Sequence, residues 1–415
     1  MFRRIQGWPL KKIDGTITFG DIGAANKGVY PGFLFLRHLL ATVILLHHAR
    51  ILTNGPHDGS TGTVIGAGLA TMSDLFASKE MLRPFLYSLV GAFFALSGFL
   101  VAGSAMRNRS LKDFLLLRIF RLLPALMMEI TLSALILGPL VTTMSLGAYF
   151  TDFNFFQYFG NLVGFVQFDL PGVFTHNPFP DRVNESLWTL DSELACYVII
   201  ALVMATGLLF NRRWFAITFL AVTTVLVIAL SSHVVDLDTR MDLTRFSRWF
   251  IVYLFFAGAM FKFFEDMIPA SATLFVLCVV AYYVLVMTGV FDIGAGLCLV
   301  YATIYVGSRR FDWFDRYCRW DLSYGLYLYG FPISQALIFF LVPNYLPHGT
   351  KGVMIVCALS LTLAVIFASA SWILVEKPAL RLKKMFVHAP AIKYREFVAA
   401  QKSGIEAAAA DAPSV

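Results

Sequence analysis

The sequence predicts an all-α protein, a polytopic membrane helical bundle of about ten transmembrane helices with both termini in the cytoplasm. The first observation is composition: 58% of the 415 residues are hydrophobic and only 14% are charged. In soluble domains about a quarter of all residues are charged. The second is a series of long apolar runs separated by short basic clusters. We therefore expect a multi-pass protein of the cell inner membrane, with the lipid bilayer as its main partner.

The apolar runs are close to the roughly 20 residues that a helix needs to cross a bilayer. They cover residues 33–53, 84–104, 122–143, 187–210, 213–231, 248–264, 271–288, 290–307, 322–343 and 352–375. With ten spans, roughly three quarters of the 33 Lys and Arg residues fall on one side, which the positive-inside rule identifies as the cytoplasm. This topology gives a cytoplasmic N-terminal segment 1–32, a transmembrane domain 33–380, and a tail 381–415 that we expect to be cytoplasmic and disordered.

Charge and cysteine content exclude two classes of site. The net charge of +7 does not indicate nucleic-acid binding, because the positive residues lie between apolar runs, where they set topology. The five cysteines lack the spacing of metal ligands, and four of them lie inside apolar runs. We therefore expect no metal site, no disulfide and no permanently bound cofactor.

The segment 144–186, between the third and fourth runs, is rich in aromatic residues but interrupted by polar residues and glycines. We expect it to be an outer loop with an interfacial or re-entrant piece rather than a full span. Its aromatic side chains either stack on sugar rings or form the belt that aromatic residues usually form at a membrane surface.

The first apolar run contains an arginine and three histidines, which are costly inside a bilayer and therefore candidates for function. Arg37 and His48 are eleven residues apart, so on an α-helix they lie within about 20° of one face and about 16 Å apart along the axis. His38 and His47 lie roughly 100° and 80° away from Arg37. Helical geometry thus singles out Arg37 and His48 as a coupled pair. The alternative is an arginine that extends to the cytoplasmic surface and a histidine that hydrogen-bonds to neighbouring helices.

The fourth run carries a carboxylate at a depth similar to that of His48. Glu193 lies about 9 Å below the outer end of its helix, and His48 about 7 Å below the outer end of its own. The two side chains could therefore meet, and a carboxylate that orients a histidine is a common way to build a general base. The alternative is that Glu193 neutralises an arginine elsewhere.

Arg118 and Arg121 are spaced i, i+3 and so point the same way at the cytoplasmic mouth of the third run. Paired guanidinium groups suit the phosphates of a nucleotide-like donor, because each can bind bidentately. From the residues alone, ordinary topological charge is the favoured interpretation.

Taken together, four motifs in the same order resemble the membrane acyltransferase-3 family, which O-acylates surface polysaccharides, lipopolysaccharide and some small molecules. The motifs are the Arg-x10-His signature at Arg37 and His48, FFALSGFL (93–100) with RIFRLLP (118–124), NESLWTLDSELACY (184–197), and SYGLYLYGFPISQ (323–335) with VEKP (375–378). They extend from about residue 33 to residue 380.

The resemblance implies an integral membrane O-acyltransferase that moves an acyl group, commonly acetyl, from acyl-CoA to a hydroxyl of a sugar in a surface or exported glycan or glycolipid. Acetyl-CoA would be a donor substrate, with its phosphates near Arg118 and Arg121 on the cytoplasmic side. His48 would be the general base, Glu193 its orienting partner, and Arg37 would lie near the donor path.

Two positions depart from the family pattern. Gly330 stands where many members carry a histidine, and Asp191 occupies a site that is more often apolar or proline, so we assign neither a role. The main alternative function is a secondary transporter or proton-coupled exporter, because intramembrane Arg, His and Glu residues also form proton relays. The sequence shows neither the inverted repeats nor the paired broken helices common in transporters. A non-catalytic scaffold with the same fold is a third possibility.

Overall fold

The computed structural model describes residues 16–55, 82–108, 110–231, 248–288, 292–318, 320–345 and 349–386. Across these residues the chain is helical and contains no strand, as an all-α fold requires. Residues 1–15 of the predicted N-terminal segment and most of the predicted tail lie outside the described residues.

The helices follow the predicted apolar runs. In chain order they are α1 (Phe19–Ala25), α2 (Phe33–Asn54), α4 (Leu82–Asn108), α5 (Leu111–Leu132), α6 (Gly138–Val141), α7 (Leu146–Thr151), α8 (Phe153–Tyr158), α9 (Leu190–Ala205), α10 (Arg212–Ser231), α11 (Arg248–Phe263), α12 (Ala272–Thr288), α13 (Asp292–Gly307), α14 (Asp312–Tyr317), α15 (Ser323–Tyr345), α16 (Thr350–Ser371) and α17 (Lys377–Phe386). Short π or 3-10 segments extend some of them: η3 (Ser133–Leu137), η4 (Phe159–Val163), η5 (Glu185–Thr189), η6 (Leu208–Phe210) and η7 (Trp372–Glu376).

Within the described residues, six helices are long and apolar enough to cross a membrane. They are Phe33–Asn54, Pro84–Arg107, Leu111–Val141, Glu185–Ala205, Ser323–Leu341 and Thr350–Leu382. Two shorter apolar helices, Ala272–Thr288 and Ile293–Gly307, accompany them. These helices indicate a multi-pass membrane protein. The total of about ten spans and the cytoplasmic placement of the termini stay predictions.

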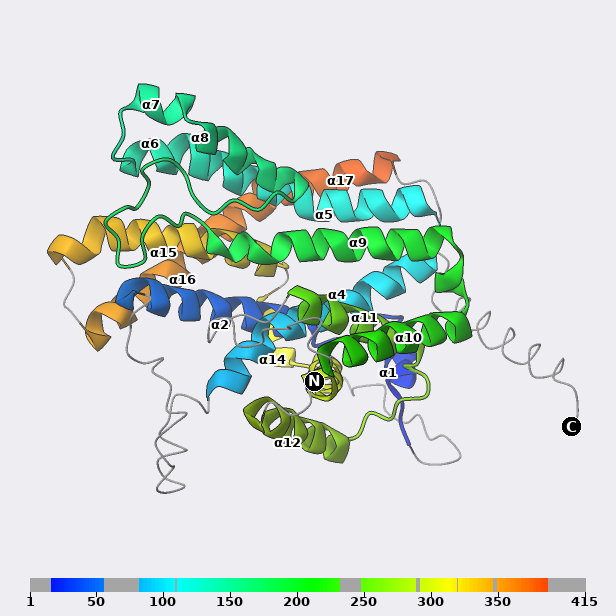
Figure 1. Cartoon of the computed structure of the whole chain (residues 1–415). Helices are drawn as coiled ribbons and strands as arrows, with labels where there is room; N and C mark the ends of the chain where they lie inside the picture. The colour runs from blue at the N-terminus through cyan, green and yellow to red at the C-terminus, as the bar shows by residue number, and fades with distance from the viewer. Residues whose placement is uncertain are drawn as a thin grey trace, which may run out of the picture.

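The bundle places α2, α5, α9 and α15 side by side and roughly parallel (Figure 1). Helix α15 packs against α2 and α16, and also contacts α5, so it lies at the centre of this group. At Gly330 the approach of α15 to α2 is close, because an added Cβ would lie 2.8 Å from the side chain of Leu45. A larger side chain at position 330 would therefore require Leu45 to move.

Helices α4 and α11 form the tightest helix pair in the described bundle, and two glycines allow it. A Cβ added at Gly98 would overlap the carbonyl oxygen of Phe255, and one added at Gly258 would overlap that of Ala95. Small residues let helix backbones approach closely where no water drives association. Gly98 belongs to the FFALSGFL motif, so this part of the motif has a packing role.

The aromatic segment after α6 forms the short helices α7 and α8, which stand at one end of the bundle beside α6 (Figure 1). Tyr149 anchors it, because its hydroxyl donates a 2.7 Å hydrogen bond to the carbonyl of Ala134 in η3. Phe153 and Phe156 are exposed. Both helices are much shorter than a bilayer crossing, in line with the prediction that this segment does not contain a full span, and its placement on the outer side stays a prediction.

The loop that follows this segment is tied to α15 by one amide. Gln335 is fully buried, and its Nε2 donates to the carbonyl oxygens of Phe179 at 2.9 Å and Arg182 at 2.7 Å. The Nδ2 of Asn177 donates in turn to Gln335 Oε1 at 2.8 Å. This network fixes the chain as it enters η5, which supplies part of the candidate site.

Candidate active site

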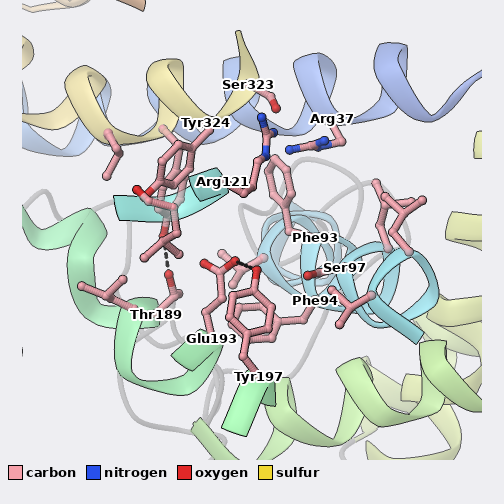
Figure 2. A pocket seen from close by; sticks show the side chains of 18 of the residues that line it. Arg37, Phe93, Phe94, Ser97, Arg121, Thr189, Glu193, Tyr197, Ser323 and Tyr324 are labelled. Carbon is pink, nitrogen blue, oxygen red and sulfur yellow. Dashed lines mark hydrogen bonds between the residues drawn. The ribbon is translucent and has the colours of Figure 1, made fainter. Parts of the chain in front are cut away.

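A cavity of about 170 Å³ lies among α2, α4, α5, α9 and α15 (Figure 2). Its charged lining consists of Arg37, Arg118, Arg121 and Glu193. Apart from these charged residues the wall is largely apolar, and Phe93 and Phe94 of α4 form part of it. Along η5 and α9 the lining runs from Ser186 to Tyr197, which is roughly 18 Å of helix. The cavity is therefore a largely apolar space inside the helical bundle, with a few charged and hydroxyl groups on its wall.

Two of the predicted arginines meet at one acidic residue. Arg37 Nη1 lies 2.5 Å and Arg121 Nη2 2.8 Å from Asp321 Oδ2. Figure 2 shows the two guanidinium groups pointing toward each other beside Ser323. The side chains are less than a quarter exposed. One carboxylate balances two guanidinium groups here, so this cluster keeps a net positive charge.

Asp321 lies just before α15, outside the membrane-spanning part of that helix. Its burial alone would raise the pKa of its carboxyl group, but the guanidinium groups of Arg37 and Arg121 outweigh burial and hold the pKa well below its usual range. The hydroxyl of Ser323 also donates to Asp321 Oδ1 at 2.5 Å. Asp321 is thus an ionised partner of the arginines, and the sequence analysis did not identify it.

Arg118 is held differently from its neighbour one helical turn away. Its Nη2 donates to Ser104 Oγ at 3.3 Å, and its guanidinium lies over the rings of Phe114 and Tyr197 at 5.8 and 5.9 Å. Arg118 has no carboxylate partner among the described residues, and its buried Nε has no hydrogen-bond partner there. A cation on the wall of a cavity that forms no direct ion pair within the described residues is suited to an anionic ligand.

Glu193 is joined to Tyr197 and not to His48. The Tyr197 hydroxyl donates to Glu193 Oε1, one turn along the same helix (Figure 2). Within the described residues, the expected contact of Glu193 with His48 is not formed. The expectation matched depths along two helices, but depth does not fix the rotation of a helix about its axis. Here that rotation directs Glu193 toward the arginines.

His48 instead contacts Ser186. Its Nδ1 lies 3.4 Å from Ser186 Oγ, and its ring packs edge-on against Phe331 at 5.5 Å. Ser186 also lines the cavity. Arg37 and His48 therefore both face the side of α2 on which the cavity and α15 lie, as the eleven-residue spacing indicates.

The other two histidines of α2 are placed differently. His38 Nδ1 donates to the carbonyl of Leu34 at 2.9 Å, which leaves Nε2 to accept the backbone N–H of Leu322 at 3.1 Å. This pattern is structural. His47 has a buried Nε2 without a hydrogen-bond partner among the described residues, and its ring lies 6.4 Å from that of His48.

No group of His, Cys, Asp and Glu side chains in the described ranges is arranged to hold a metal ion. The arginines of the cavity are anion-binding groups rather than metal ligands. The protein is thus a helical membrane bundle with a cationic cavity, and one residue of the cavity wall, Ser186, contacts His48. Such a site is suited to an anionic ligand and to proton transfer.

The comparison with known proteins identifies the family. The chain belongs to the acyltransferase-3 family, because residues 32–371 match the family's acyltransferase domain. It is 26% identical over 338 residues to a protein of Shigella phage Sf6 described as an O-acetyl transferase, across 76% of this chain and 94% of the relative. No solved structure matches the chain. The protein is therefore a membrane enzyme of the O-acetyltransferase type.

Proposed function

We propose that the enzyme transfers an acetyl group from acetyl-CoA, bound from the cytoplasmic side of the inner membrane, to a hydroxyl of a sugar in a surface or exported glycan. One observation carries the proposal. A single cavity is lined by Arg37, Arg118 and Arg121 and also by Ser186, the residue that contacts His48. An anionic donor held by the arginines can therefore extend toward the histidine without leaving the cavity.

The donor half of the site is cationic. Guanidinium groups bind phosphates bidentately, and Arg118 has no carboxylate among the described residues to satisfy first. Arg37 and Arg121 are paired with Asp321. Phosphates of the donor would share these two arginines with Asp321 or replace it. The apolar wall formed by α4 suits the pantetheine chain. The lined length of roughly 18 Å along η5 and α9 is comparable to the roughly 16 Å that separates Arg37 and His48 along α2.

The acceptor half is neutral and rich in hydroxyl groups. Thr189 Oγ1 lies 2.9 Å from the Tyr327 hydroxyl, which donates to the carbonyl of Ser186 at 2.8 Å. Hydroxyl groups both donate and accept, so they match the hydroxyls of a sugar. The name of the phage relative specifies transfer to oxygen, which agrees with an acceptor of this kind.

His48 would act as the general base. When Nδ1–H donates to Ser186 Oγ, Nε2 is the basic atom of the ring. Nε2 takes the acceptor proton as the acceptor oxygen attacks the thioester carbonyl carbon. The C–S bond then breaks, and the departing thiolate of CoA takes the proton from the histidine. Protons balance without any external acid or base, and the ester and free CoA are the products.

Two neighbouring histidines provide the test. In membranes that hold the endogenous acceptor, we would measure transfer of radiolabelled acetyl from acetyl-CoA into glycan. His48→Ala should lower transfer by about 10² or more, the usual contribution of a positioned base. His47→Ala is the matched control and should stay within a few-fold of wild type.

Equal losses in the two variants, or full transfer by His48→Ala, would overturn the role of His48. Absence of acetyl transfer by the folded wild-type protein would instead favour a transporter that uses the same intramembrane residues.

A further inference from the structure

Glu129 is a buried carboxylate of α5 that the proposed reaction does not use. Glu129 is only 1% exposed. Oε1 accepts hydrogen bonds from the Ser133 hydroxyl and from Asn184 Nδ2, both at 2.9 Å. Oε2 has no hydrogen-bond partner among the described residues. Burying a carboxyl group with half of its bonding capacity unused is costly, so an acid at this position calls for a reason other than stability.

Asn184 is the side chain that Glu129 orients. It is fully buried at the start of η5, and its Nδ2 has two acceptors, Glu129 Oε1 and the carbonyl of Leu328 at 3.0 Å. Its Oδ1 accepts the backbone N–H of Ser186 at 3.2 Å. An amide can turn over by 180°, and the two acceptors on one side select the orientation that leaves Oδ1 facing Ser186.

Ser186 links Asn184 to His48 through its backbone and its hydroxyl. Its backbone N–H is held by Asn184 and its carbonyl by the Tyr327 hydroxyl, so the backbone is fixed on both sides. A fixed backbone fixes Ser186 Cβ and limits the hydroxyl to the staggered χ1 rotamers, and the rotamer present places Oγ 3.4 Å from His48 Nδ1. The chain of contacts runs from α5 through η5 to α2 and ends on the proposed base.

We infer that Glu129 is a positioning residue, which sets the orientation of Asn184 and, through Asn184 and Ser186, the ring of His48. The inference rests on the proposed function, because it takes His48 as the base. Glu129 itself touches neither donor nor acceptor. Its removal should therefore change the rate of transfer and leave donor binding, which depends on Arg118 and Arg121, unaltered.

The test compares Glu129→Leu with Glu129→Gln in the same membrane transfer assay, with rates normalised to folded protein. Glu129→Leu removes the acceptor for Asn184, so kcat should fall roughly tenfold or more while KM for acetyl-CoA stays within twofold. Glu129→Gln keeps an oxygen acceptor for Asn184 and should restore kcat to within a few-fold of wild type. Glu265→Leu is the control: it removes a different buried carboxylate, paired with Lys262 at 2.6 Å, and should lower protein yield without lowering kcat.

A double substitution separates positioning from general damage. If Glu129 acts through Ser186, Glu129→Leu should cost less than twofold when it is added to Ser186→Ala, because the link is already broken. Fully multiplicative effects would overturn the inference, as would an unchanged kcat in Glu129→Leu or a rise in KM that Glu129→Gln does not correct.

If Glu129→Leu fails to accumulate in the membrane, Asn184→Ala breaks the same link and carries the same prediction. Failure of both variants to fold would contradict positioning and assign these residues a purely structural role. The His48→Ala result keeps the two proposals apart. An active His48→Ala enzyme overturns the proposed function, whereas an inactive one with a fully active Glu129→Leu overturns only this inference.

Discussion

The two ends of the cavity use opposite kinds of interaction. At the arginine end, which the proposed topology makes the inner end, Arg37 and Arg121 form direct ion pairs with Asp321, and all three groups carry fixed charge. At the opposite end, which the proposed topology makes the outer end, Ser186 and His48 are linked by hydrogen bonds with neutral amide and hydroxyl groups. Under the proposed function, charge lies where the anionic donor would bind, and neutral hydrogen bonds lie where the histidine would exchange a proton and hold a fixed orientation.

The largest effect should follow from breaking the charge balance at the inner end. Asp321→Asn leaves two partly buried guanidinium groups without their shared ion-pair partner, and should lower the free energy of unfolding by about 2–4 kcal/mol. Thermal unfolding of the purified variants in detergent would measure this. Asp312→Asn is the matched control, because its carboxylate is 73% exposed and lies 3.7 Å from Arg310, where a surface pair contributes little.

Acetyl-CoA sharpens the same comparison. Its phosphates should replace the lost carboxylate, so the ligand should stabilise Asp321→Asn more than it stabilises the wild type. Identical unfolding of Asp321→Asn and wild type would show that the inner cluster does not depend on this balance of charge.

A smaller effect is expected at the outer end. Tyr327→Phe removes the hydroxyl that donates to the Ser186 carbonyl, and the loss of about 1 kcal/mol should lower kcat roughly fivefold. Tyr329→Phe provides the control on the same helix, since its hydroxyl donates to Ser371 of α16 instead. Equal kcat values for the two variants would remove Ser186 from the ordering of the outer end.

The smallest effect concerns pH. Because the arginines depress the pKa of Asp321, its contribution to stability is fully present above the ordinary aspartate pKa near 4 and is lost as pH falls toward the folded pKa. The difference in melting temperature between wild type and Asp321→Asn should therefore be constant from about pH 8 to about pH 5.5 and shrink below about pH 4. A difference that already shrinks between pH 8 and 5.5 would contradict this account of the inner cluster.

Local periodicity was sufficient to predict the helices and the directions of several side chains. The apolar runs coincide with helices because burial in lipid requires that every backbone group is hydrogen-bonded within its own segment. The eleven-residue spacing of Arg37 and His48, and the i, i+3 spacing of the cavity arginines Arg118 and Arg121, are properties of a single helix. They survive in the structure for that reason.

Contacts between helices were harder to predict. Asp321 precedes α15 and reaches arginines on α2 and α5, so no local pattern indicates it. Glu193 was matched to His48 by depth alone, although the i, i+4 spacing of Glu193 and Tyr197 was a local signal for the pair that forms. Ser186 lies in a quoted motif, but its link to His48 depends on how η5 is held by α5 and α15.

The most direct test of the account is the binding of acetyl-CoA to the purified, detergent-solubilised protein. Wild type would be compared with the Arg118→Ala/Arg121→Ala double variant and with His48→Ala. The account predicts saturable binding to the wild type, at least tenfold weaker binding to the double variant, and unchanged binding to His48→Ala, because the donor is held at the inner end and the chemistry takes place at the outer end. Equal binding by the double variant and the wild type, or no binding by folded wild type, would contradict it.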